Sequence, residues 1–184
     1  SLKLNNPDLC VLRALLGISN LLLFYWALRH IPIMNASLLA RTSGLFIPII
    51  SFLLFKTKTQ RRIVLAIIIG FVGTILVLQP KAGFINPYDL IALASGVTAA
   101  LTMVILREAV KRDKPQAVLF YYFLIAVVLC GVLAALHWKT PSYQVVLLLL
   151  GVGIFGTIYQ VCLTYASHNA PASIVSGLLY LVVV

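Results

Sequence analysis

The residues most able to handle a ligand are the few polar side chains that lie deep inside long apolar stretches. Arg41 follows Asn35 by six residues, which corresponds to roughly 9 Å along a helix axis. A guanidinium group at that depth can attract a carboxylate or a phosphate, whereas its long side chain can also reach outward to lipid headgroups. Arg41 is therefore a candidate for binding an anionic substrate, with an interfacial anchor as the alternative.

A second group of polar side chains comes from two segments that are far apart in the sequence. Asn20 lies near the middle of the apolar stretch Val11–Ile31, and Tyr159 and Gln160 lie near the middle of Val145–Ala166. Amide and phenol groups can exchange hydrogen bonds with a polar metabolite, or bond across a helix interface. We expect these three side chains at a similar depth, either as substrate ligands or as interhelical contacts.

Pro48 is the one proline far inside an apolar stretch, Met34–Phe55. A proline within a helix lacks a backbone N–H donor and displaces the carbonyl four residues earlier, so it bends the helix. Gly44, one turn earlier, makes such a bend easier. Kinked helices line the substrate pathway in many transporters, although proline is also tolerated in membrane helices as a packing feature. We predict a kink at Pro48 and count this residue as a candidate for the substrate pathway.

Other kinds of chemistry lack the residues that they need. The four acidic side chains fall in loops or terminal turns, so no carboxylate at membrane depth can relay protons or activate a serine as a nucleophile. The three histidines are expected on different sides of a membrane, and the three cysteines do not have a metal-binding spacing. No phosphate-binding loop is present. We expect no catalytic residue, no metal site and no cofactor.

Apolar segments that fill most of the chain position these residues. Hydrophobic residues make up 62% of the 184 residues, charged residues 10%, and the mean hydropathy is +1.08, unlike a soluble domain. A membrane-spanning helix needs about 20 mostly apolar residues. The sequence therefore predicts an all-α, polytopic transmembrane helix bundle. Six stretches are long enough, and a seventh begins after Pro171: Val11–Ile31, Met34–Phe55, Ile63–Gln79, Tyr88–Leu106, Gln116–Leu136 and Val145–Ala166.

Small residues one helical turn apart indicate where these helices approach one another. Such pairs let two backbones come close, which is the main source of helix association in lipid. The pairs are Ala66 with Gly70, Gly70 with Gly73, Gly96 with Ala100, and Gly153 with Gly156.

The basic residues indicate how the bundle is oriented. The formal net charge is +10, and most of the positive charge falls near the N-terminus, at Lys3 and Arg13, and in the loops 56–62 and 107–114. Because short cytoplasmic loops are enriched in Lys and Arg, we predict that these loops face the cytoplasm. A nucleic-acid surface is not expected, since no soluble domain organises the charges. The opposite face carries Arg29, Lys81 and Lys139.

An internal repeat appears when the chain is compared with itself at an offset of 139 residues. The chain crosses the membrane five times between the start of the first stretch and the start of the sixth, and an odd number means that the related segments cross in opposite directions. This is the pattern of an inverted repeat, which builds many secondary transporters around a site near the bilayer midplane. The identities pair Gly17 with Gly156, Ala27 with Ala166, Pro32 with Pro171, Ser37 with Ser176 and Leu39 with Leu178.

Several segments resemble the EamA-type transporters of the drug/metabolite transporter superfamily. The run Tyr25–Leu39 resembles the junction between the third and fourth helices of that family, and Gly70–Pro80 resembles its fifth helix. Asp89–Arg107 resembles the start of the second repeat, and Ala170–Ser176 resembles the second-repeat counterpart of the first junction. One departure lies at 56–59, which reads Lys-Thr-Lys-Thr where family members often carry Gly-Glu.

The resemblance implies ten helices in two inverted five-helix repeats, of which this chain would hold about six and a half. Residues 1–80 would belong to the first repeat and residues 81–184 to the second. The implied function is secondary transport of small metabolites or drugs by alternating access, in the plasma membrane of a bacterium. The expected partners are a small-molecule substrate, the lipid bilayer and, as one option, a second copy of the chain. The alternatives are a non-transporting scaffold or remnant subunit and, with less support, a membrane enzyme.

Overall fold

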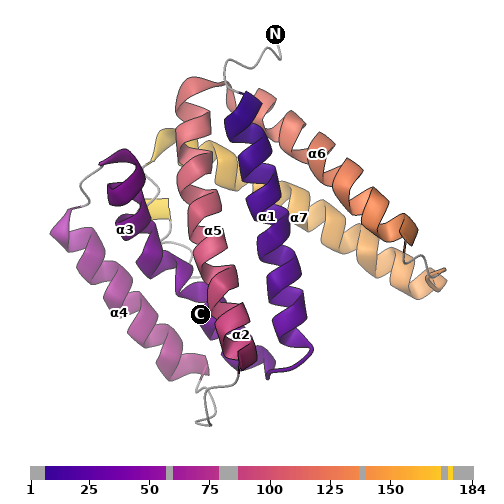
Figure 1. Ribbon diagram of the computed structural model, residues 1–184, viewed down its shortest axis with the longest axis horizontal. Helices are drawn as coiled ribbons and strands as arrows, with labels where there is room; N and C mark the ends of the chain where they lie inside the picture. The colour runs from indigo at the N-terminus through magenta and orange to yellow at the C-terminus, as the bar shows by residue number, and fades with distance from the viewer. Residues whose placement is uncertain (1–6, 57–59, 79–86, 137–139, 171–173, 176–184) are drawn as a thin grey trace.

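The computed structural model describes residues 7–56, 60–78, 87–136, 140–170 and 174–175. Within these ranges the chain forms seven α-helices and no strand (Figure 1). In chain order the helices are α1 (Pro7–Leu28), α2 (Ile33–Arg41), α3 (Ser43–Phe55), α4 (Arg61–Leu78), α5 (Pro87–Arg112), α6 (Pro115–Leu136) and α7 (Tyr143–Asn169).

The predicted all-α, polytopic membrane bundle is confirmed. Five helical segments of the described chain are long and apolar enough to cross a bilayer: α1, α2 together with α3, α5, α6 and α7. The stretch predicted over Ile63–Gln79 corresponds to the 18-residue helix α4. The seventh stretch, after Pro171, lies almost entirely outside the described residues. The chain is therefore an integral membrane protein.

Prolines mark where several helices begin. Pro7, Pro87 and Pro115 are the first residues of α1, α5 and α6, and Pro32 directly precedes α2. Proline is favoured at the first helical position because its backbone nitrogen needs no hydrogen-bond partner there and its φ angle already suits a helix. The connectors between apolar stretches could thus be located from the sequence.

The helix predicted over Met34–Phe55 is interrupted at Thr42 and not at Pro48. α2 ends at Arg41 and α3 begins at Ser43, while Pro48 lies inside α3. The Thr42 hydroxyl donates a hydrogen bond to the Leu39 carbonyl at 2.5 Å, and the Leu45 N–H bonds to the Thr42 carbonyl in a tighter, three-residue turn. The kink at Pro48 stays a prediction, and the interruption at Thr42 is a second irregularity in this segment.

α5 lies at the centre of the bundle and contacts α1, α2, α3, α6 and α7. Its buried face begins with the small residues Ala92, Ser95, Gly96 and Ala100. A Cβ atom added to Gly96 would lie 2.8 Å from the Leu39 carbonyl oxygen, which is backbone of α2. The predicted close approach at Gly96 and Ala100 is therefore confirmed, and it falls beside the interruption at Thr42.

The two ends of α5 are tied to different neighbours. At its start, Tyr88 stacks on His30 with ring centroids 3.9 Å apart. At its end, Arg107 donates hydrogen bonds to the Ser167 and His168 carbonyls of α7, and the Val110 carbonyl accepts one from His168 Nδ1 at 2.9 Å. These contacts fix α7 along α5, whereas the first half of α7 and the second half of α6 extend together to one side (Figure 1).

Candidate functional site

A cavity of about 270 Å³ opens where five helices meet in the middle of the bundle. It lies among α1, α3, α5, α6 and α7, and its wall combines polar and apolar side chains. Such a cavity differs from the rest of the chain, where polar side chains are scarce. The lining residues are Arg13, Gly17, Asn20, Leu21, Ser43, Ile47, Ala99, Thr102, Met103, Leu106, Tyr122, Tyr159, Gln160 and Leu163.

α1 presents three of these residues on a single face. Arg13, Gly17 and Asn20 follow the spacing of four and then three residues that places side chains one above another on a helix. A Cβ atom added to Gly17 would lie 3.5 Å from the ring of Tyr122, at ordinary van der Waals distance. The aromatic ring of α6 therefore lies against α1 beside the cavity.

Arg13 is the one charged side chain among the described residues of the cavity wall, and only 1% of its surface is exposed. Its Nη2 atom donates to Gln160 Oε1 and to Thr164 Oγ1, each at 3.4 Å. Its Cζ atom lies 4.4 Å from the centroid of the Tyr122 ring, within the range of a cation–π interaction. The guanidinium therefore joins α1 to α6 and α7 at the cavity.

Gln160 connects the polar groups of the cavity to one another. Its amide oxygen accepts from Arg13, and its Nε2 atom donates to the Tyr122 hydroxyl at 3.1 Å. Thr164, one turn later on α7, donates to the Gln160 carbonyl at 2.8 Å. The donors and acceptors of α7 thus form one connected network facing α1 and α6.

The guanidinium of Arg13 is only partly satisfied by this network. Its Nε and Nη1 atoms have no hydrogen-bond partner among the described residues. Glu108 forms ion pairs with Lys111 at 3.2 Å and Arg112 at 3.0 Å, and no ion pair is formed between Arg13 and any described carboxylate. The cavity consequently carries a net positive charge. It can bind a polar or anionic group, but within its wall it has no nucleophile paired with a base.

The structure brings together three of the residues selected from the sequence. Asn20, Tyr159 and Gln160 all line the cavity, although half of the surface of Tyr159 is exposed. Arg41 does not line it; this residue ends α2 beside the interruption at Thr42 and is partly buried. Pro48 lines a separate apolar groove of about 580 Å³ between α3 and α4.

Arg13, Tyr122 and Thr164 belong to the site but were not among its predicted residues. The position of Arg13 on the cytoplasmic side stays a prediction, and the structure shows in addition that this residue lies inside α1 and is buried. A signal was available: Arg13 follows Val11, the start of the first predicted span, and shares a helical face with Gly17 and Asn20. Thr164 also bonds within its own helix, to the Gln160 carbonyl.

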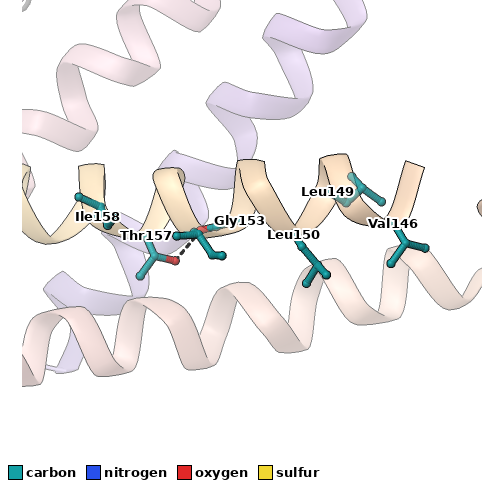
Figure 2. A pocket seen from close by; sticks show the side chains of 7 residues that line it. Val146, Leu149, Leu150, Gly153, Thr157 and Ile158 are labelled. Carbon is teal, nitrogen blue, oxygen red and sulfur yellow. Dashed lines mark hydrogen bonds between the residues drawn. The ribbon is translucent and has the colours of Figure 1, made fainter. Parts of the chain in front are cut away.

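A second groove of about 580 Å³ lies on α7 and is apolar (Figure 2). Its one polar side chain, Thr157, donates to the Gly153 carbonyl of its own helix at 2.8 Å. A Cβ atom added to Gly153 or Gly156 would meet no atom within 4 Å. This groove offers no polar group to a ligand, and no described helix packs against the predicted pair Gly153 and Gly156.

The sequence model of the EamA-like transporter family matches residues 4–79 and 86–184. The chain belongs to the EamA-like transporter family. Its helices and the polar cavity among them agree with this assignment.

Curated EamA relatives carry the names of transporters of several different compounds. The chain is 26% identical to a pseudopaline exporter of Pseudomonas aeruginosa over all of its length and 66% of the relative. It is 29% identical to a riboflavin transporter of Vibrio cholerae, with 90% of the chain and 56% of the relative covered. It is 27% identical to an S-adenosylmethionine uptake transporter of Rickettsia bellii, covering 98% of the chain and 62% of the relative. The chain thus spans somewhat less than two thirds of the length of these relatives. No solved structure matches it.

Proposed function

We propose that this EamA-family chain is part of a secondary transporter of small metabolites, with the cavity at Arg13 as its substrate site. The observation that carries the proposal is a network of polar side chains in the middle of an otherwise apolar bundle. Burying such groups costs free energy unless they have partners. Polar side chains kept inside a membrane bundle generally serve a ligand or an ion.

The names of the relatives support transport as the activity and leave the substrate open. A pseudopaline exporter, a riboflavin transporter and an S-adenosylmethionine uptake transporter all resemble the chain at similar identity. These compounds differ in size and charge. One of the relatives is named an exporter and another an uptake transporter. We therefore propose neither a direction nor a named compound.

Within the site, we assign the amide groups of Asn20 and Gln160 to hydrogen bonding with the substrate. Asn20 lines the cavity from α1, and Gln160 lines it from α7. Tyr159 lines the same wall at its more exposed edge and is proposed as an entry residue. The scaffold alternative would need these groups only for helix packing.

Alternating access requires one part of the bundle to move relative to another. The interruption at Thr42 divides one membrane span into two helices, and an interrupted helix can change direction at low cost. We propose that Arg41 beside it and Pro48 within α3 belong to this moving segment. The family match falls in two parts, 4–79 and 86–184, which supports two repeats that meet near residue 80.

We further propose that the bundle lies in the plasma membrane of a bacterium with the loops 56–62 and 107–114 in the cytoplasm. Single cysteines introduced at Arg29 and Lys111 test this orientation in cells. An impermeant maleimide added outside should label the cysteine at position 29 and leave the one at position 111 unlabelled. The reverse result would invert the proposed topology.

Flux through reconstituted vesicles tests the transport proposal. The complete gene product that contains this chain is placed in liposomes, and uptake of radiolabelled riboflavin, S-adenosylmethionine and a mixture of amino acids is measured against empty liposomes. Gln160→Leu should lower the flux of any transported probe about tenfold, because it removes hydrogen bonds to Arg13 and Tyr122. Gln144→Leu, which changes an exposed residue of the same helix, is the matched control.

Other outcomes would favour the alternatives. Binding of a probe without flux in either direction would indicate a scaffold. Chemical conversion of a probe without net movement would indicate a membrane enzyme.

A further inference from the structure

We propose that Arg13 binds a carboxylate, so that the substrates of this site are small monoanions with an apolar or aromatic body. The inference rests on the proposed transport function, since it names the substrate class of the same cavity. It is independent of which direction the substrate moves.

The guanidinium of Arg13 is incompletely hydrogen-bonded. Arg13 is 1% exposed, and its Nε and Nη1 atoms lack partners in the part of the chain that the structure describes. Together these two atoms carry three of the five N–H donors of an arginine. The remaining nitrogen makes two long contacts of 3.4 Å, to Gln160 and Thr164. A buried donor without an acceptor is costly, and more so when it is charged.

The positive charge of Arg13 is not neutralised by any described carboxylate. An arginine side chain stays protonated in proteins, so burial cannot be relieved by loss of its proton. No described carboxylate forms an ion pair with Arg13. The Tyr122 ring, with its centroid 4.4 Å from Cζ, attracts the cation through its quadrupole, which is weaker than a full negative charge. A charge-assisted pair with an anion would satisfy both the charge and the unpaired donors.

The charge of the cavity limits the charge of its ligand. Among the described residues that line the cavity, Arg13 alone carries a charged side chain. A carboxylate brings a single negative charge, whereas a phosphate monoester brings between about 1.5 and 2 near pH 7. One arginine balances a carboxylate and leaves a phosphate monoester partly unbalanced in a medium where excess charge is expensive.

The rest of the ligand would meet apolar surface. The cavity wall also includes Leu21, Ile47, Met103 and Leu163, and the Tyr122 ring lies beside Arg13. The cavity volume of about 270 Å³ is small compared with most ligand pockets. A carboxylate on a compact aromatic or aliphatic body fits these properties.

Binding of matched probes to the complete gene product tests the inference. Benzoate and benzamide have nearly the same shape and differ in charge, and their affinities are measured by calorimetry in zwitterionic nanodiscs. We expect benzoate to bind at least about tenfold more tightly than benzamide. Arg13→Gln should abolish this preference, whereas Arg29→Gln should keep it, because Arg29 is exposed and does not line the cavity.

Two further arms separate the sources of the anion and the role of the arginine. Adding an anionic phospholipid to the nanodiscs should leave benzoate affinity unchanged if the site takes soluble carboxylates; competition by the lipid would overturn this assignment in favour of a headgroup site. Benzoate should raise the melting temperature of the wild type but not of Arg13→Gln, a difference that a purely structural arginine would not produce. If Arg13→Gln does not fold, Arg13→Lys, which keeps the charge and loses the planar fork, should retain a weaker preference.

The failures of the two proposals can be told apart. Equal affinity for benzoate and benzamide in the wild type overturns the carboxylate site, while flux of neutral or cationic probes would leave the transport proposal standing. A clear preference for benzoate without flux of any probe overturns transport and leaves the anion site in place.

Discussion

α5 and α7 are both long, apolar helices, yet one is enclosed and the other is open. In the most apolar 18-residue stretch of α5, 44% of the residues are buried, against 0% in that of α7. α5 contacts five other helices, while the first half of α7 and the second half of α6 extend beyond them (Figure 1). We call these two half-helices, residues 127–136 and 143–158, the outer arm.

The difference follows from residue size more than from hydrophobicity. The buried face of α5 starts with alanine, serine and glycine, which let neighbouring backbones approach. The outer arm carries leucine, valine, isoleucine and phenylalanine with large exposed areas. In lipid, an apolar side chain gains little by moving from acyl chains to a protein surface, so close backbone packing decides which helix is central. Small residues mark the interior only where a neighbouring backbone packs on them, as at Gly96, since Gly153 and Gly156 of the outer arm remain open.

Adding a side chain to a glycine on α5 and to one on α7 is the most stringent test of the contrast between the enclosed and the open helix. A Cβ atom at Gly96 would lie 2.8 Å from the Leu39 carbonyl oxygen, whereas none lies within 4 Å at Gly153. Overpacking costs about 1 to 3 kcal/mol and more where backbone must shift. Gly96→Leu should lower the melting temperature of the detergent-purified protein by about 5 °C or more, or prevent folding.

Gly153→Leu is the matched control and should leave the melting temperature within about 2 °C of the wild type. Equal losses in the two variants would mean that another surface covers α7 in the folded protein. That result would remove the contrast between α5 and the outer arm.

The general architecture could be predicted because membrane helices are limited by length and proline position. The spans and the starts at Pro87 and Pro115 followed from the sequence. The interruption at Thr42 could not be predicted, because it depends on a hydroxyl bond to Leu39 and on the close approach of Gly96. Pro48 was the more visible signal, but it lies in the interior of α3.

The site was predicted in part for a similar reason. Asn20, Tyr159 and Gln160 were selected because they are polar at membrane depth, and they line one cavity. Arg13 lies close to the start of its span, so the positive-inside pattern assigned it to the cytoplasmic face. It is buried where it contacts Tyr122 of α6 and Gln160 and Thr164 of α7. Depth counted along a single helix does not reveal what neighbouring helices cover.

Two threonine hydroxyls offer a finer test of the contrast between the interior and the outer arm. Thr42 bonds to the Leu39 carbonyl at 2.5 Å and is 8% exposed, while Thr157 bonds to the Gly153 carbonyl at 2.8 Å on the exposed side of α7. Hydrogen bonds inside membrane bundles contribute about 0.6 kcal/mol on average. Thr42→Val should therefore lower the melting temperature by about 1 to 2.5 °C, and Thr42→Ser, which keeps the hydroxyl, should recover most of that loss. Thr157→Val should change it little, because lipid accepts a methyl group in place of the hydroxyl. If instead Thr42→Val left the melting temperature unchanged and Thr157→Val lowered it, the Thr42 hydroxyl bond would not stabilise the interruption between α2 and α3. The close approach of α2 at Gly96 would then be the interaction that stabilises this part of the interior.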